Sequence, residues 1–226
     1  MTCVTENIES IQKLLYSARG GSIKMINKLH LAMIELYRGD AKRIQHFCKV
    51  HSYAKLIAET ENVDKECLFI IEAAALTHDI GIHFCEEKYG NCNGKLQEQE
   101  GPAIAERLLE KLGFEKDISE RVQYLIAHHH TYNNINEIDY QILVEADFLV
   151  NIMEDGLSKE AALKAYHNIF KTVCGKTICR EMFDIDIKYV NFSWILSILW
   201  YTNYGISKMG GRLKNEQKRR KRVKVF

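Results

Sequence analysis

A single proline, Pro102, in 226 residues is the feature that most constrains how this chain folds. Proline interrupts helices, and its scarcity beside many Leu, Ile, Ala, Glu and Lys residues predicts a nearly all-helical protein. Glycines mark the ends of eight or nine helices, and Asp40, Asp64 and Ser158 are expected to cap the starts of three of them. We expect helices near residues 6–18, 22–37, 41–60, 65–79, 98–112, 117–130, 137–155, 159–172 and 176–183, with a loop, containing at most a short helical turn, over 83–95.

The length suits one large domain, or one domain with a small appendage. No segment reaches the roughly 18–20 apolar residues of a membrane-spanning helix. The first residues, MTCVTENIESIQKLL, are polar and acidic, unlike a secretory signal. The seven cysteines are an odd number without a C-x-x-C pair, so we expect reduced thiols in a cytoplasmic protein.

Positive charge concentrates at the C-terminal end. Residues 210–226 carry eight basic side chains and one acid, Glu216, whereas the rest of the chain has 23 basic and 29 acidic residues. Such a tail could bind RNA, DNA or an anionic surface by charge alone, but we favour a dispensable, disordered end. The apolar stretch 190–201 before it is too short to span a bilayer and is expected to form a packing helix or an oligomer contact.

One histidine of the helix 41–60 is expected in the core. At 100° per residue, His46 shares a face with Val50, Ala54 and Ile57. A buried imidazole needs a partner, either a backbone group or a metal ion. For His46 taken alone, the backbone partner is the better hypothesis.

The helix 65–79 ends in an adjacent histidine and aspartate, His78 and Asp79. The residues before them are apolar nearly all round, which predicts the central buried helix of the fold. An aspartate at a helix C-terminus opposes the helix dipole, so it disfavours stability and suits the binding of a cation.

Two later helices add further candidate ligands. His129 continues the apolar face of the helix 117–130, so at least one of the consecutive histidines 128–130 should point inward. Glu145 and Asp147 interrupt a helix that is apolar on almost every side. A buried carboxylate without a partner is costly, so each is expected to need a cation or a proton. Inward histidines with carboxylates are the ligand set of a catalytic divalent metal.

Three segments carry these candidate ligands in the order histidine, histidine-aspartate, aspartate. They are HFCKVHSYA at 46–54, LTHDIG at 76–81 and VEADFLVN at 144–151. With these spacings the chain resembles the HD-domain superfamily of metal-dependent phosphohydrolases over roughly residues 40–172. The resemblance implies an all-α HD-domain bundle over 40–186, with helices of residues 1–39 packing on it and an extension at 187–226. It also implies a divalent metal (Mn, Fe, Co, Ni or Zn) held by His46, His78, Asp79 and Asp147, of which His78 and Asp79 would be the catalytic pair.

Two-metal branches of the superfamily have further histidines before the last aspartate. At the corresponding positions this chain has Glu100, His128 and His129, which would bind a second metal. Glu100 replaces a histidine there, and an acid favoured by the dipole at a helix N-terminus is an equally good interpretation. Lys88, in the expected loop, is a candidate for binding the substrate phosphate, although a solvated lysine is the stronger interpretation.

The sequence therefore predicts an enzyme that hydrolyses a small phosphate ester, such as a nucleotide, with metal-activated water. One alternative is a di-iron oxygenase, because some relatives oxidise their substrates with dioxygen at the same ligands. Another is a non-catalytic interaction module, against which the intact ligand set argues. The substrate, the metal and the oligomeric state do not follow from the sequence.

Overall fold

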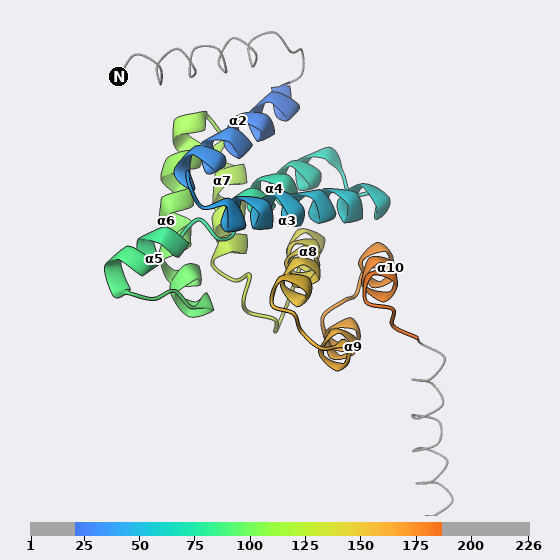
Figure 1. Ribbon diagram of the computed structural model, residues 1–226. Coiled ribbons are helices and arrows are strands. Elements are labelled where there is room, and N and C mark those ends of the chain that lie inside the picture. The colour runs from blue at the N-terminus through green and yellow to red at the C-terminus, as the bar shows by residue number, and fades with distance from the viewer. Residues whose placement is uncertain (1–20, 187–226) are drawn as a thin grey trace, which may run out of the picture. The chain divides into compact units, whose positions relative to one another are not determined.

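The computed structural model describes residues 21–186, and every regular element in that range is a helix (Figure 1). This confirms the all-α prediction. The expected helix near 6–18, the apolar stretch 190–201 and the basic tail lie outside the described residues. The helices are α2 (Gly21–Leu36), α3 (Ala41–Thr60), α4 (Lys65–Thr77), α5 (Ile82–Tyr89), α6 (Gly94–Leu112), α7 (Lys116–Ile126), α8 (Ile138–Glu154), α9 (Lys159–Asn168) and α10 (Val173–Met182).

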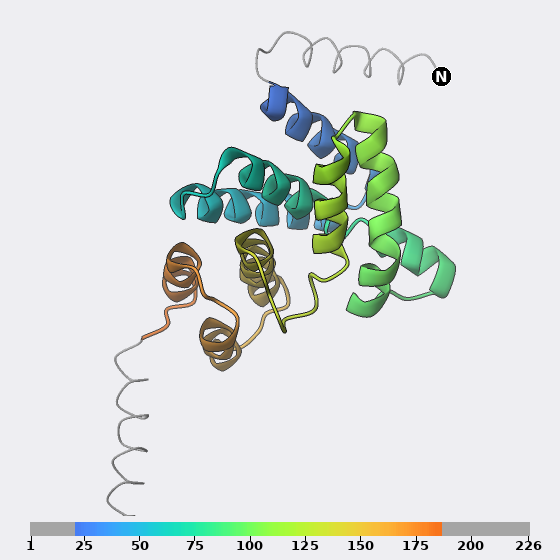
Figure 2. The same cartoon turned by 180° about the vertical axis from the view of Figure 1, so that it is seen from behind.

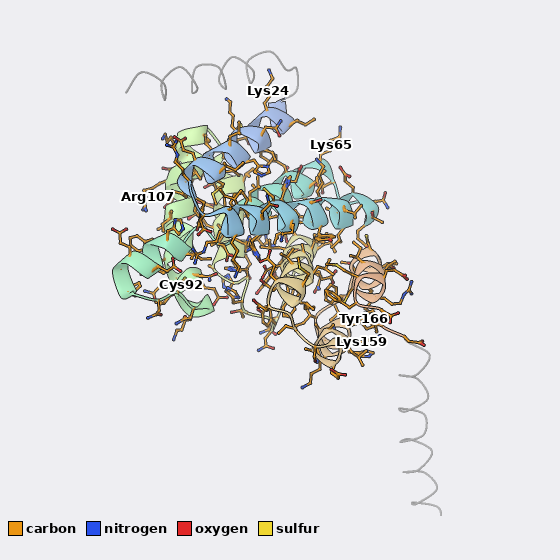
Figure 3. The ribbon with its side chains drawn as sticks, viewed as in Figure 1. Lys24, Lys65, Cys92, Arg107, Lys159 and Tyr166 are labelled. Carbon is orange, nitrogen blue, oxygen red and sulfur yellow. The ribbon has the colours of Figure 1, made fainter. Side chains whose placement is uncertain are left out.

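Helix α4 is the centre of the bundle. It packs against α2, α3, α7 and α8, and every residue from Ile70 to Thr77 is buried. Helices α3 and α4 lie side by side, as do α6 and α7, in the views from both sides (Figures 1 and 2). Charged side chains such as Lys65 and Arg107 extend outward from this apolar interior (Figure 3). The fold thereby directs the C-terminal end of α4, with its histidine and aspartate, into the protein.

Several helices begin at the side chains expected to cap them. The Asp40 carboxylate accepts a hydrogen bond from the backbone N–H of Arg43 at 3.1 Å, and Asp64 accepts one from Cys67 at 2.8 Å. These bonds satisfy N–H groups that have no partner within the helix. Asp40 thus fixes the start of α3, six residues before His46.

The segment 83–95 was expected to be a loop with at most a short helical turn, but its first half belongs to a helix of 8 residues. Helix α5 occupies Ile82–Tyr89, with Ile82 and Cys85 buried, and it packs on α6. The turn before α5 touches α6 at two glycines: a Cβ added to Gly81 would lie 3.1 Å from the backbone nitrogen of Gly101. This close approach brings the N-terminal half of α6 beside the end of α4.

Other boundaries also differ from those expected. Helix α6 begins at Gly94 because the Asn93 side chain caps it, and α9 ends at Asn168 because Thr172 caps α10. Helix α7 ends at Ile126, so the three histidines lie in the turn that follows it and not on the helix. Their directions are therefore not set by the 100° helical period.

One stretch, Lys65–Tyr89, is long and apolar enough to cross a membrane by length and composition. Of its apolar window, 67% is buried inside the structure, and the stretch consists of α4, a turn and α5. This is the character expected of a core helix.

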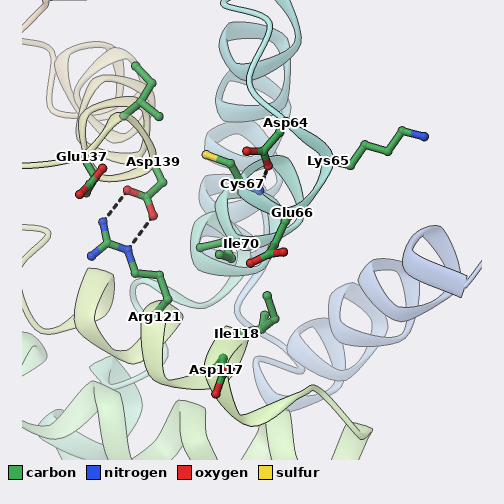
Figure 4. Close-up of a pocket in the computed structure, with 11 residues that line it drawn as sticks. Asp64, Lys65, Glu66, Cys67, Ile70, Asp117, Ile118, Arg121, Glu137 and Asp139 are labelled. Carbon is green, nitrogen blue, oxygen red and sulfur yellow. Dashed lines mark hydrogen bonds and ion pairs between the residues drawn. The ribbon is translucent and has the colours of Figure 1, made fainter.

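A cavity of about 730 Å³ lies where the N-terminal ends of α4, α7 and α8 meet (Figure 4). Its lining includes the acids Asp64, Glu66, Asp117, Glu137 and Asp139. Acids at helix N-termini are favoured by the helix dipole, and the most buried of these, Asp139, accepts two hydrogen bonds of 2.7 Å from Arg121. This cavity is at the opposite helix ends from the histidines.

Candidate metal centre

The four residues predicted to bind the first metal come together. His46 is on α3, His78 is the C-cap of α4, Asp79 follows it, and Asp147 is on α8. The His46 Nε2 atom lies 3.2 Å from His78 Nε2, 3.5 Å from Asp79 Oδ2 and 3.3 Å from Asp147 Oδ1. The His78 Nε2 atom lies 3.6 Å from Asp79 Oδ2 and 3.5 Å from Asp147 Oδ1. Four ligand atoms from distant parts of the chain thus face one point.

The helical period accounts for the direction of His46. The buried residues of α3 are His46, the three residues expected to share its face (Val50, Ala54 and Ile57), and Phe47 and Ala58 beside them. The apolar stripe that packs α3 against α4 and α8 therefore carries His46 inward with it.

The outer nitrogens of the two imidazoles have partners that fix their protonation. His78 Nδ1 lies 2.9 Å from the carbonyl oxygen of Ala75, and His46 Nδ1 lies 3.1 Å from Glu154 Oε2. Both partners are acceptors, so each Nδ1 carries the proton and donates it. Each Nε2 of a neutral ring then has only a lone pair. Two lone pairs 3.2 Å apart cannot hydrogen-bond to each other, but both can coordinate a cation.

The Asp147 carboxylate provides a second, independent test of whether a cation fits. Its Oδ1 atom is buried and has no hydrogen-bond partner among the described residues. The Nε2 atoms of His46 and His78 lie 3.3 Å and 3.5 Å from it. A buried anionic oxygen without a donor is strongly unfavourable, and a cation between these atoms would remove the penalty. The donor set, two imidazoles and two carboxylates, suits a divalent transition metal.

The pKa shifts of His46 and Asp147 also indicate that the cluster favours a positive charge. Burial opposes a positive charge on His46, but Asp147, Asp79 and Glu154 outweigh burial and raise the pKa of His46 to about 9. Burial likewise opposes ionisation of Asp147, yet His46 and His78 hold the pKa of Asp147 well below its usual range. The cluster therefore attracts positive charge, which a proton or a metal ion can supply.

Asp79 forms the open edge of the cluster. Its side chain is 21% exposed, whereas those of His78 and Asp147 are 1% and 3% exposed. Its backbone carbonyl accepts a 2.7 Å hydrogen bond from the hydroxyl of Tyr37, a buried residue that follows α2. A molecule that reaches the cluster from solvent meets Asp79 first.

A second group adjoins the first at Asp79. The His129 Nε2 atom lies 3.6 Å from Asp79 Oδ1, and His129 Nδ1 lies 2.8 Å from the carbonyl oxygen of Ile126. As expected, one histidine of the run points inward: His129 is 1% exposed. His130 joins this group, with ligand atoms of Asp79, His129 and His130 within 4.8 Å of one another. Burial and the neighbouring His129 lower the pKa of His130 to about 4, so this ring is neutral at pH 7.

Of the three residues predicted for a second ion, the structure brings only His129 to Asp79. His128 Nδ1 lies 2.7 Å from the carbonyl oxygen of Tyr124, on whose ring His128 also packs. Glu100 Oε1 accepts hydrogen bonds from the Tyr89 hydroxyl at 2.5 Å and from Lys88 at 3.2 Å. The turn after α7 and the unforeseen helix α5 account for these placements.

Lys88, the residue predicted to bind substrate phosphate, has partners of its own. Besides the bond to Glu100, its ammonium nitrogen lies 5.1 Å from the ring centre of Phe84 and 4.7 Å from that of Tyr89. Its role toward a phosphate stays a prediction.

Glu145 does not need the cation or proton that the sequence suggested. Its carboxylate accepts hydrogen bonds from the backbone N–H groups of Lys171 and Thr172, the Thr172 hydroxyl and the Gln141 amide. Donors from a segment 26 residues away thus satisfy this buried charge and fix the approach to α10.

Three residues that contact the site were not predicted from the sequence: Glu154, Tyr37, and Gln97, whose Oε1 atom lies 3.3 Å from His129 Nε2. Glu154 lies seven residues after Asp147, two helical turns along the same face of α8, and this spacing could have identified it. Tyr37 and Gln97 carry no such signal, because their neighbours at the site come from other helices.

Comparison with known proteins gives the following. The family model described as HD domain matches residues 43–169. A crystal structure of a predicted HD superfamily hydrolase from an uncultured Thermotogales bacterium is 22% identical, with a TM-score of 0.51, over 77% of this chain and 92% of that one. YpgQ from Bacillus subtilis is 19% identical, with a TM-score of 0.50, over 75% of this chain and 92% of its own. At these identities the two structures show a shared fold. No curated protein matches significantly.

Proposed function

Because the chain belongs to the HD-domain family, we propose that it is a metal-dependent phosphohydrolase that cleaves a small phosphate ester, such as a nucleotide, with metal-activated water. The observation that carries this proposal is the buried Asp147 Oδ1, which lies 3.3 Å from His46 Nε2 and 3.5 Å from His78 Nε2, so that the centre needs a proton or a cation between these atoms. A cation bound between these atoms would remove the cost of burying this carboxylate.

His46, His78, Asp79 and Asp147 would hold the ion. When bound, it would lower the pKa of a coordinated water toward neutrality and polarise the phosphoryl group. Glu154 and the Ala75 carbonyl keep the two imidazoles turned with Nε2 inward.

The remaining residues of the site face the entering substrate. The exposed edge at Asp79 is the side from which a phosphate ester enters. The Asp79 Oδ1 atom lies on that side, next to His129 Nε2. Because His129 Nδ1 donates to a backbone carbonyl, its Nε2 lone pair faces Asp79 and can accept a hydrogen bond from a group bound there.

A metal-screened assay against a panel of phosphorylated metabolites tests this proposal and identifies the substrate. The double variant His78→Ala, Asp79→Ala should lose activity with every metal while keeping its helical circular dichroism, because the pair lies at a helix end. His167→Ala is the matched control, since His167 is an exposed histidine on α9. Full activity in the double variant would exclude the hydrolase assignment. Iron-dependent oxygen consumption in place of phosphate release would favour the oxygenase alternative.

A further inference from the structure

Two aromatic side chains lie beside the metal centre. Tyr132 belongs to the segment between α7 and α8, and Phe148 directly follows Asp147 on α8. Their ring centres are 5.0 Å apart with an angle of 69° between the planes, so the edge of one ring meets the face of the other. Tyr132 is 41% exposed, and Phe148 is half-buried. The pair is therefore a partly exposed aromatic surface next to a proposed metal ligand.

Tyr132 is connected to Asp79 through one histidine. The Tyr132 hydroxyl oxygen lies 3.5 Å from His130 Nδ1, and a ligand atom of His130 lies within 4.8 Å of one of Asp79. Asp79 is the more exposed side chain of the His78-Asp79 pair and forms the open edge of the metal centre. A single imidazole ring thus separates Tyr132 from the edge at which a phosphate ester would enter.

The exposed surface of Tyr132 lies mainly on its ring. Burial, with Asp147 and Glu98 nearby, raises the pKa of Tyr132 to about 12, so the hydroxyl end of the side chain is the part that is directed into the site. An apolar ring face in contact with water is unfavourable. A planar ligand that stacks on this face would remove it from water.

The sequence around Tyr132 is otherwise polar. Residues 131–137 are TYNNINE, in which Tyr132 is the one aromatic residue. Packing on Phe148 also holds this segment against α8, and an aliphatic side chain at position 132 would serve that purpose. An aromatic ring differs from an aliphatic group in its flat face, which pairs with other planar rings. Replacement of Tyr132 by leucine therefore separates a role in stacking from a role in packing.

We propose that Tyr132, supported by Phe148, stacks on a planar aromatic ring in the organic part of the substrate and so selects such esters over sugar phosphates. This inference rests on the proposed function, because it places the phosphate of the substrate at the metal centre. The separation of Tyr132 from Asp79 by one ring matches a nucleoside monophosphate, in which one sugar ring separates the phosphate from the base.

Adenosine 5′-monophosphate and ribose 5-phosphate are matched probes, because they differ only in the base. With the most active metal, the wild-type chain should have a KM about tenfold lower for the nucleotide, as stacking of a base on an aromatic side chain predicts. Tyr132→Leu should raise this KM about tenfold and leave kcat and the KM for ribose 5-phosphate unchanged. Tyr132→Phe keeps the ring and should keep the preference. Tyr166→Leu is the matched control, since Tyr166 is a half-exposed tyrosine on α9 that packs against His167.

Saturation-transfer NMR adds a readout that does not depend on hydrolysis. Irradiation of the wild-type protein should saturate the adenine protons of the nucleotide, and this transfer should fall in Tyr132→Leu and persist in Tyr166→Leu. Circular dichroism establishes that the variants are folded.

Three outcomes would overturn the proposal: a wild-type chain without preference for the nucleotide, a Tyr132→Leu variant that keeps the preference, or one that weakens both probes equally, as loss of a packing contact would. Saturation of the adenine protons that depends on Tyr132, without release of phosphate from either probe with any metal, would instead remove the proposed function and support the stacking site.

Discussion

Glu154 offers a direct test of how the metal centre is oriented. Its Oε2 atom accepts a 3.1 Å hydrogen bond from His46 Nδ1, and its Oε1 atom accepts a 2.6 Å hydrogen bond from Lys49. Its side chain is 12% exposed, so water does not readily replace it. We expect that Glu154→Ala leaves the His46 ring free to rotate and to change its tautomer.

The size of the effect follows from this contact. Loss of the partner that orients a metal-binding histidine typically costs 10- to 100-fold in metal affinity, or about 1.4–2.7 kcal/mol. Glu154→Gln keeps an oxygen acceptor but loses the charge, so its metal affinity should fall about tenfold. Glu154→Ala loses both the acceptor and the charge, so its metal affinity should fall nearly 100-fold. Lys49→Met is the matched control, because it removes the other partner of Glu154 and leaves the bond to His46 in place.

Competition with a fluorescent chelator for Zn²⁺ or Mn²⁺ measures these affinities in the purified variants. Affinities of Glu154→Ala and wild type that agree within twofold would refute the role given to Glu154. A loss in Lys49→Met as large as that in Glu154→Ala would show that the ion pair, and not the bond to His46, carries the effect.

Three further predictions concern stability. Arg121→Met leaves the buried Asp139 carboxylate without its partner and should lower the free energy of unfolding by about 3 kcal/mol, with unchanged metal affinity. Urea denaturation measures this, and an unaltered midpoint of the unfolding transition would contradict it. Partial burial opposes ionisation of Asp40, yet the backbone N–H and guanidinium of Arg43 lower the pKa of Asp40 from its ordinary 3.8 to about 2. Because the folded pKa is the lower one, the stabilisation is present above about pH 4 and is lost as the pH falls toward 2. Asp40→Asn should therefore cost about 2 kcal/mol at pH 7 and progressively less in acid, as denaturation at several pH values would reveal. Metal at about 1,000 times its dissociation constant should add about 4 kcal/mol to the free energy of unfolding, and both a chelator and Asp147→Asn should abolish this gain in thermal melts.

The parts of the site that the sequence predicted lie on regular helices or directly at their ends. His46 could be placed because an apolar stripe of period 3.6 carries it inward, and the Asp40 and Asp64 caps could be placed because a helix start has a local chemical requirement. The His78-Asp79 pair could be placed because it follows a helix that is apolar nearly all round, and such a helix lies in the core. The division of the chain at residues 39 and 186 stays a prediction.

The parts that the sequence reading missed depend on contacts between distant segments. His130, and not His128, lies with His129 beside Asp79. Helix α7 ends at Ile126, and side-chain directions in the turn that follows have no fixed period. Glu100 was predicted equally as a ligand of a second metal and as an acid favoured by a helix dipole; in the structure Lys88 and Tyr89 of the helix Ile82–Tyr89 donate hydrogen bonds to it. The position of Gln97 depends on the close approach of Gly81 and Gly101, which no local pattern reveals.

The bond from Tyr37 to the Asp79 carbonyl also has a consequence for motion in the N-terminal part of the fold. Helix α2 lies before the residues that the family model matches, yet Tyr37, directly after it, holds the backbone of a proposed metal ligand. Any local opening that detaches the end of α2 therefore releases Asp79, and an ion bound at Asp79 resists that opening. Amide protons in the last turn of α2 should consequently exchange with solvent more slowly once metal is bound, although none of them touches the ion. The end of α2 and the metal centre would then unfold and refold as one cooperative unit.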